Sequence, residues 1–267
     1  MFFNVQLITY HSIANVVLMN YKSNTVDTQM HLMINAMNYT QYLSPGQITV
    51  GVSDQPLYAI KKEIQFSFPN RFHDYFCYMG GLHLEQAGLV CIGQIISGSG
   101  IDKIVSSASL DIIGLTTAVC DVNNIKKARY TLQLIAVVLM KLLKDAYEIS
   151  DSPEPLFTWA DNYNDNLMFE FWYNVLKSIK VVFLLIRSFR EANIDLMIAV
   201  LKSMMPLFFA LDHSNYSRWA SVFLEDLKSM PLKFPSLFQE FKSGKFVFNV
   251  RSNEFFKNCH GPGSRTK

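Results

Sequence analysis

The chain has 267 residues, half of them hydrophobic, so it can bury a sizeable core and extensive disorder is excluded. Its formal net charge is +2 and only 17% of its residues are charged, which gives no electrostatic indication of nucleic-acid binding. The four cysteines include no Cys-x-x-Cys pair, which excludes a structural zinc site of the usual spacing, and no apolar run approaches the roughly 18 residues that predict a membrane span.

The N-terminal part of the chain, residues 1–83, is predicted to be an α/β unit. A ragged apolar face predicts a helix over residues 26–43, which Ser-Pro-Gly at 44–46 ends. Residues 48–53 alternate between apolar and small polar side chains and predict a strand. Residues 72–79 predict a second strand that is buried. We therefore expect a mostly α fold with a small β-sheet, an α/β arrangement.

Asp54 follows the first predicted strand directly. It has the same parity as the apolar residues of that strand and lies at its carboxyl end, where ligands and catalytic groups collect in α/β sheets. Pro56 suits the first turn of a new helix, which has Leu57, Ile60 and Ile64 on its inner face. Asp54 is therefore either a functional acid or the N-cap of this helix, and both interpretations stay open.

A second group of polar residues follows the second strand. Gly80 and Gly81 end that strand, and a helix is predicted from Leu82 to Ile96. Within it, His83 and Glu85 match the His-x-Glu of zinc deaminases, but the Pro-Cys-x-x-Cys that this chemistry also requires is absent. We therefore discard the deaminase interpretation.

Residues 84–205 are predicted to be a helical insertion. Apolar residues recur at three- and four-residue steps from Ile125 to Leu142 and again from Phe171 to Phe189, with lysine and arginine on the opposite faces. Residues 150–155 form a linker between these two helices. A further helix, opened by Asn193 and Asp195, is predicted to end at Pro206.

A third polar group begins the C-terminal part, residues 206–250. Asp212 comes after an apolar run and before a helical pattern that runs from Tyr216 to Met230. We favour Asp212 as the N-cap of that helix, with a functional acid as the alternative. A short helix around Phe238 and a short strand over residues 245–250 are expected next, and residues 251–267 are expected to be loose.

Three motifs stand in order: Gly-Val-Ser-Asp-Gln-Pro-Leu-Tyr-Ala at residues 51–59, Met-Gly-Gly-Leu-His-Leu-Glu at 79–85, and Phe-Phe-Ala-Leu-Asp-His-Ser-Asn-Tyr-Ser-Arg-Trp at 208–219. Together they resemble a transposon-derived group described as a domain of unknown function, family 6589. The resemblance covers roughly residues 28–250.

The resemblance implies a transposase-like protein with an incomplete ribonuclease-H-like core and a large helical insertion. Asp54 and Asp212 would be its catalytic metal ligands and would hold Mg²⁺ or Mn²⁺ for two-metal nucleotidyl transfer at a phosphodiester. Glu85 is implied as a further catalytic carboxylate. DNA is the implied partner, with no membrane, and the implied location is intracellular and nuclear. The implied binding residues are His83, His213, Asn215 and Arg218.

The sequence departs from that family after Val247. The family continues into a segment with acids and histidine, whereas in residues 253–263 here Glu254 is the only acid. Because a site that lacks one of three carboxylates loses most of its activity, we expect a truncated or decayed protein that is inactive as it stands.

Three hypotheses about function remain at this point. The first is a nucleotidyl-transfer enzyme or its remnant, with Asp54 and Asp212 close enough to share a pair of metal ions. The second is a non-catalytic helical module that binds protein or nucleic acid, which the low charge and long helical middle favour. The third is that the motifs form a buried polar network that holds the fold together without chemistry.

Overall fold

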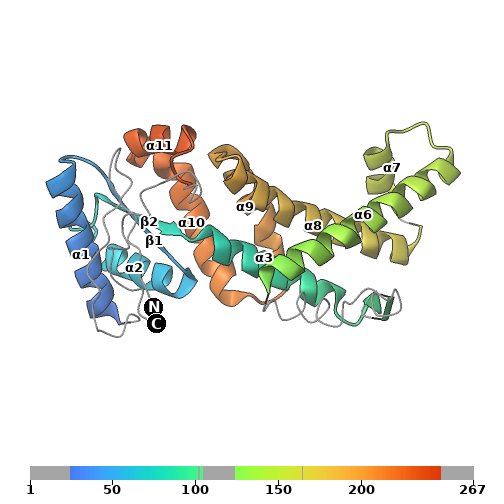
Figure 1. The fold of residues 1–267 in the computed structure, drawn as a ribbon, viewed down its shortest axis with the longest axis horizontal. Helices are drawn as coiled ribbons and strands as arrows, with labels where there is room; N and C mark the ends of the chain where they lie inside the picture. Colours follow the sequence, from blue (N-terminus) through green and yellow to red (C-terminus); the bar gives the residue numbers. More distant parts are fainter. Residues whose placement is uncertain (1–24, 102, 105–123, 164, 248–267) are drawn as a thin grey trace, which may run out of the picture.

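The computed structural model describes residues 25–101, 103–104, 124–163 and 165–247. Most of these residues are helical, and two strands form a parallel sheet (Figure 1). This confirms the predicted mostly α fold with a small sheet, although the two strands do not show a ribonuclease-H-like core. The helices run over Val26–Leu43 (α1), Gln55–Ser67 (α2), Gly81–Ile96 (α3), Ile125–Ser150 (α6), Leu156–Asn162 (α7), Leu167–Arg190 (α8), Ile194–Ala210 (α9), Ser214–Lys233 (α10) and Pro235–Lys242 (α11).

The sheet is one β-α-β unit. Strand β1 (Thr49–Ser53) and strand β2 (Tyr75–Met79) are parallel because α2 carries the chain back to the same end of the sheet. Both strands were predicted. Every residue of β2 is buried, which explains why its sequence is apolar throughout and does not alternate.

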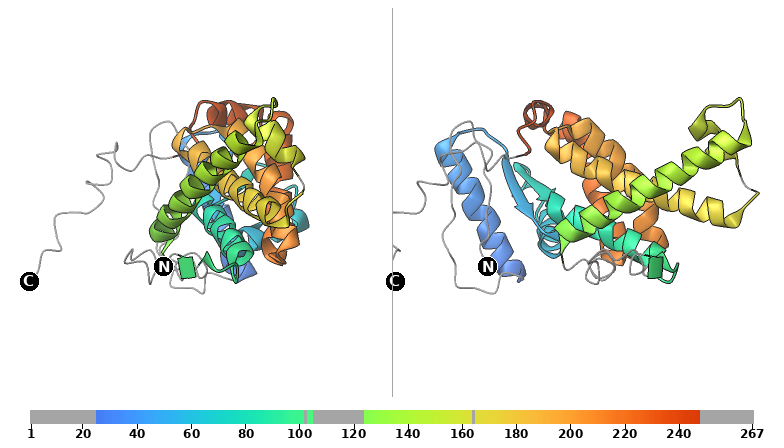
Figure 2. Two further views of the ribbon diagram at one scale, coloured as in Figure 1. Left: turned by 90° about the vertical axis from the view of Figure 1, so that its right-hand side faces the viewer. Right: turned by 45° about the vertical axis from the view of Figure 1, so that its right-hand side comes forward.

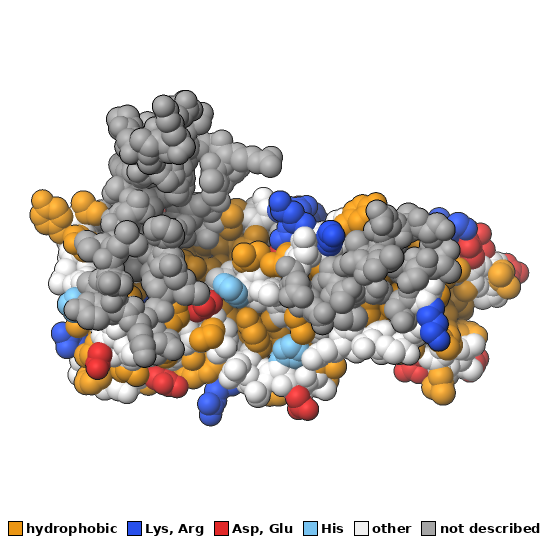
Figure 3. All heavy atoms as spheres, turned by 60° about the horizontal axis from the view of Figure 1, so that its bottom comes forward, with side chains coloured by type: hydrophobic (Ala, Val, Ile, Leu, Met, Phe, Trp, Pro, Cys, Tyr) orange, Lys and Arg blue, Asp and Glu red, His pale blue; other side chains and the backbone are white. Residues whose placement is uncertain are grey.

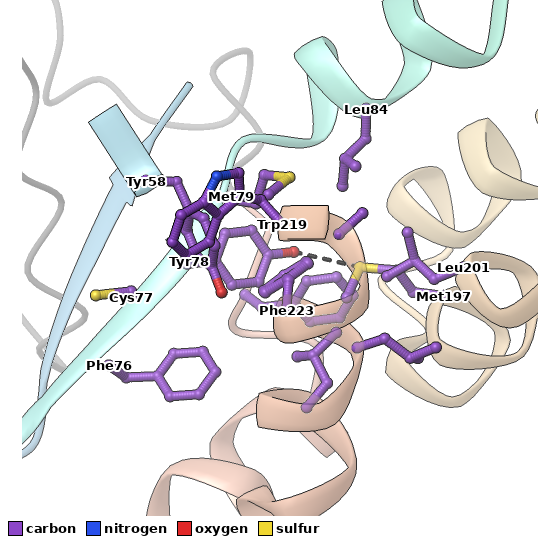
Figure 4. Packing of buried hydrophobic residues seen from close by; sticks show 14 of the residues in the cluster. Tyr58, Phe76, Cys77, Tyr78, Met79, Leu84, Met197, Leu201, Trp219 and Phe223 are labelled. Carbon is purple, nitrogen blue, oxygen red and sulfur yellow. Dashed lines mark hydrogen bonds between the residues drawn. The ribbon is translucent and has the colours of Figure 1, made fainter. Parts of the chain in front are cut away.

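The main core lies where β2 meets the C-terminal helices. Tyr78 packs edge-on against Phe223 of α10 with ring centroids 5.2 Å apart, and its hydroxyl lies 3.3 Å from Met197 Sδ of α9 (Figure 4). Phe76 contacts Phe241 of α11 in the same edge-on manner, with centroids 6.0 Å apart. Segments far apart in sequence are therefore joined by aromatic packing across β2.

One helix does not end at Pro206 as predicted, and a second helix also continues through a proline. Helix α9 continues through Pro206 to Ala210, and α10 continues through Pro231 to Lys233. Each proline stands within the last turns of its helix, where the loss of one backbone hydrogen bond is cheapest, and the side chain of Phe208 remains fully buried beyond Pro206. Tertiary packing thus outweighs the local tendency to stop.

Helices α6, α7 and the first half of α8 (residues 167–178) project away from the sheet, and we call them the arm (Figures 1 and 2). At its far end, aromatic rings hold α7 between the two long helices. The ring centroid of Trp159 in α7 lies 5.5 Å from that of Tyr147 in α6 and 5.5 Å from that of Phe169 in α8. No helix in the described part of the chain is long and apolar enough to cross a membrane.

The predicted C-terminal strand is not formed in its described part. Residues 245–247 lie in turns after α11, because Gly244 adopts a left-handed conformation (φ +86°) that diverts the chain. Residues 248–250 and the tail at 251–267 lie outside the described residues. The predicted domain divisions after residues 83, 205 and 250 stay predictions.

Candidate functional site

The carboxyl ends of the two strands bring the first two motifs together. Ser53 and Met79 are register partners at the last position of the sheet, and the amide of Gly80 donates to the carbonyl of Ser53 over 2.8 Å. Asp54 comes directly after β1 and precedes α2, and Gly81 is the first residue of α3. The sheet geometry expected from sequence is therefore present at this edge.

Asp54 is the N-cap of α2. Its side-chain oxygen accepts a hydrogen bond from the amide of Leu57 over 3.2 Å, and Pro56 stands in the first turn as predicted. Burial raises the pKa of Tyr216 to about 12, and the nearby negative charge of Asp54 contributes to the rise. Tyr216 of the third motif therefore lies near Asp54.

Two contacts attach the third motif to α3. The hydroxyl of Tyr216 donates to the carbonyl of His83 over 3.2 Å. The Nε2 atom of His213 lies 2.9 Å from Oε1 of Gln94, and burial lowers the pKa of His213. Residues 119 and 133 positions apart are joined in this way, but the first contact is exposed and the second only part-buried, so together they do not form the buried network of the third hypothesis.

Asp212 does not cap α10, contrary to the favoured interpretation. It has a left-handed backbone (φ 53°) and directly follows Leu211, the C-cap residue of α9. The amide of His213 donates to the carbonyl of Phe208 over 3.0 Å, which is the six-to-one bond of a Schellman ending. Aspartate tolerates this conformation better than most residues, so its position ends the preceding helix.

Glu85 is buried and forms an ion pair with Arg129 of α6. The Nε atom of Arg129 donates to one carboxylate oxygen and a terminal guanidinium nitrogen donates to the other. Both oxygens are thus engaged by a bidentate contact between α3 and α6.

The other predicted binding residues lie near the surface of the same region. Asn215 and Arg218 are exposed in the first turns of α10. The guanidinium of Arg218 lies 5.9 Å from the ring centroid of its neighbour Trp219. His83 is half-buried and contributes its backbone carbonyl to the contact with Tyr216.

No group of three or more His, Cys, Asp or Glu side chains that could hold a metal ion occurs among the described residues. The catalytic roles of Asp54, Asp212 and Glu85, and binding of Mg²⁺ or Mn²⁺ by the two aspartates, stay predictions. So do the binding roles of His83, His213, Asn215 and Arg218.

A polar contact that sequence reasoning missed joins α2 to α10. Asp226 accepts from the hydroxyl of Tyr58 over 3.2 Å and lies 2.9 Å from Nζ of Lys62. The helical spacing puts Lys62 away from the apolar face that includes Leu57 and Ile64, but it is buried because α10 packs there. Only the tertiary arrangement of α10 could have revealed this.

The arm carries a large apolar groove between α6 and α8. Its volume is about 610 Å³, within the range of ligand and partner sites in proteins. Several of its apolar residues remain largely exposed, among them Val138 and Leu142 at 57% and Met168 at 65%. The groove is lined by Ile101, Ile104, Thr131, Leu134, Ile135, Val138, Leu139, Leu142, Leu143, Ala146, Asn166, Met168, Phe169, Trp172, Tyr173 and Leu176.

The groove also escaped sequence reasoning, which treated α6 as having a single apolar stripe. Apolar residues occupy eight of the nine positions from Leu132 to Met140, so they extend well beyond one helix face. The part of the stripe that contains Leu132 and Ile135 packs inside the protein, whereas Leu142 at its end and Val138 are left on the outside. An apolar run without a polar side was the signal available in the sequence.

No curated protein and no solved structure matches this chain. A family model matches it over residues 2–154 and 154–260, and this is not the transposon-derived family 6589 that the three motifs resembled. That resemblance was wrong, and nothing in the match indicates a transposon origin. Short motifs with separately explicable roles, as a strand end, an N-cap and a helix ending, were insufficient to identify a family. The chain belongs to the family described as Domain of unknown function (DUF8702).

Proposed function

We propose that this protein is a non-catalytic helical module that binds protein, and that the arm groove takes an amphipathic helix of its partner. The observation that carries the proposal is the open apolar groove between α6 and α8. Exposed apolar surface of this kind is unfavourable in water and marks interaction sites when it is contiguous.

The dimensions of the groove favour a helix as occupant. On α6 it extends from Thr131 to Ala146, which corresponds to about 24 Å at 1.5 Å per residue. Two helices already form its walls, so a third helix would complete a packing arrangement of ordinary kind. Its apolar face would cover Val138, Leu142 and Met168.

The surroundings of the groove argue against a small apolar ligand. Ile149 and Leu167, which lie toward the tip of the arm, are 85% and 83% exposed. Neither residue lines the groove, so a ligand confined to it would leave both in water. A helical partner is long enough to reach them.

The motif junction at the sheet edge supports a module without chemistry. Asp54, Asp212 and Glu85 each already have a structural role, as an N-cap, a helix-ending residue and an ion-pair partner. Of the three, Glu85 is buried, and a buried polar group holds a fold together when it is satisfied, as Glu85 is by Arg129. This supports the binding hypothesis over the catalytic one.

The test is fluorescence anisotropy with a labelled model peptide about five turns long, with leucine at three- and four-residue steps and alanine, lysine and glutamate elsewhere. We expect saturable binding, weakened at least about tenfold by Leu142→Glu because this places a charge in the groove. Leu232→Glu is the matched control, since Leu232 is 89% exposed on α10 outside the groove. Absence of binding, or equal weakening by both substitutions, overturns the proposal.

A further inference from the structure

We infer that the helical partner of the arm is a second copy of this chain, and that two arms pair antiparallel about a two-fold axis. The inference rests on the proposed helix-binding function and identifies the partner. It comes from the distribution of charge along the arm, which the apolar groove alone does not explain.

The arm has opposite charges at its two ends. Residues 145–170, which include the tip, contain seven acidic residues and no lysine or arginine. Residues 125–144 contain five basic residues and no acid, and residues 171–190, which run from the arm into the rest of α8, contain four basic residues and no acid. Acidic side chains are visible at the right-hand end of the face in Figure 3, which is the end that holds the arm tip in Figure 1.

Antiparallel pairing would satisfy this distribution. The acidic tip of one arm would lie against the basic base of the other, twice in the same dimer, because a two-fold axis repeats every contact. Parallel pairing would instead place the two acidic tips together and leave the basic segments side by side. Charge complementarity therefore selects one orientation.

The middle of α6 gives the register of the pair. The helix runs from residue 125 to residue 150. When two antiparallel copies overlap along their whole length, residue 125 of one faces residue 150 of the other. Residue n then faces residue 275 − n, because 125 + 150 = 275. Lys127 would then lie opposite Glu148 of the partner subunit. Val138, which is 57% exposed, would lie next to the axis.

The charges that this register brings together are available. Lys126, Lys127, Glu148 and Asp151 are exposed, and none of them forms an ion pair with another residue in the described part of the chain. Some other charges of the arm are already used locally, as in the 3.1 Å contact between Lys141 and Asp145. The four charges that this register brings together are therefore free to pair across the proposed interface.

The available surface is large enough for a dimer. Helix α6 has 26 residues and is therefore about 39 Å long, and a face two helices wide measures about 20 Å across. The product is roughly 800 Å² per copy, which matches the usual size of a stable interface per partner.

The experiment measures molar mass by light scattering against protein concentration. We expect the mass to approach twice 30.6 kDa and the dissociation constant to rise with salt. The double variants Lys126→Glu/Lys127→Glu and Glu148→Lys/Asp151→Lys should each raise the dissociation constant at least about tenfold, because each places like charges opposite each other. Circular dichroism checks that both remain folded.

An equal mixture of the two double variants supplies the decisive comparison. Each copy of one variant then faces complementary charges on the other, so we expect mixed dimers to form with nearly the wild-type dissociation constant. A monomeric wild type, or a mixture that stays monomeric, overturns the inference. If the labelled peptide still binds that monomer, the proposed function survives; if it does not, both fail.

Discussion

Asp54 and Asp212 each occupy a position that a helix end requires. Asp54 satisfies a free amide at the start of α2, and Asp212 takes the left-handed conformation that ends α9. Their order in the chain had indicated a shared metal site. The backbone roles account for both aspartates without a metal, so substitutions must separate the two explanations.

Replacing Asp54 tests which role it has. Asparagine caps helices about as well as aspartate, whereas alanine does not, so Asp54→Asn should leave the free energy of unfolding nearly unchanged and Asp54→Ala should lower it by about 1 kcal/mol. Urea unfolding with and without MgCl₂ measures both effects. If Mg²⁺ stabilises the wild type but not Asp54→Asn, the aspartate is a metal ligand and the structural explanation is insufficient.

The Glu85–Arg129 ion pair should respond unequally to loss of its two partners. Glu85 is buried but Arg129 is partly exposed, so Arg129→Met leaves a buried charge without a partner whereas Glu85→Leu leaves a cation that water can reach. We expect costs of about 3 and 1 kcal/mol respectively in urea unfolding. The double substitution should cost less than the sum, and strict additivity would contradict a direct coupling of α3 to α6.

The thiols of Cys77 and Cys91 should be inert in the folded protein. Burial raises the pKa of each from about 9 to about 12, so almost no thiolate is present at pH 8. In a variant with serine at positions 120 and 259, we expect no reaction with a thiol reagent until urea unfolds the protein. Rapid native labelling at pH 8 would show that these residues are accessible.

The same pKa rise predicts how stability depends on pH. As the pH rises above about 9, the unfolded thiols lose protons before the folded ones do. The contribution of the two cysteines is therefore complete below pH 9 and is lost as the pH approaches 12. Replacing both by alanine should flatten this part of the stability profile.

At the scale of elements, Gly51 leaves room against β1 for the side chain of Tyr75 from β2. A Cβ atom at this position would lie 1.7 Å from the hydroxyl oxygen of Tyr75, which is fully buried. We expect Gly51→Ala to lower the free energy of unfolding by about 1–3 kcal/mol, because the ring of Tyr75 must move within a packed core. Chemical denaturation measures this, and an unchanged midpoint would show that the ring has room to move.

The sequence predicted those elements whose signals are local. The alternation over residues 48–53, the apolar stretch at 72–79 and the asparagine that opens α9 at Asn193 all correspond to observed structure. The continuation of helices through Pro206 and Pro231 could not be predicted, because it depends on burial of the turns around them. Local propensity is a weak guide where packing decides.

The candidate site shows the same limit. The meeting of the first two motifs could be anticipated, because parallel strand ends share one edge of a sheet. The pairing of Glu85 with Arg129 and of Lys62 with Asp226 could not, since each joins helices whose relative placement the sequence does not give. The groove required knowing which apolar face of α6 the rest of the protein leaves uncovered.

At the scale of the whole molecule, apolar residues of the arm serve two purposes, which are packing within the protein and the proposed binding of a partner. One face of α6 packs with α3 and α8 in a core of its own, while the other borders the groove. The charges at tip and base then restrict how a partner can lie along it. A self-complementary surface of this kind gives a closed dimer and no open chain of copies.

A single cysteine beside the proposed axis tests this arrangement most directly. In the variant with serine at positions 120 and 259, we would introduce Val138→Cys, with Leu232→Cys as a more exposed control outside the arm, and analyse each under mild oxidation. Antiparallel pairing brings the two copies of residue 138 together, so we predict a disulfide-linked dimer for Val138→Cys and little for Leu232→Cys. Equal cross-linking of the two variants, or none at residue 138 in a protein that light scattering shows to be dimeric, would contradict this arrangement.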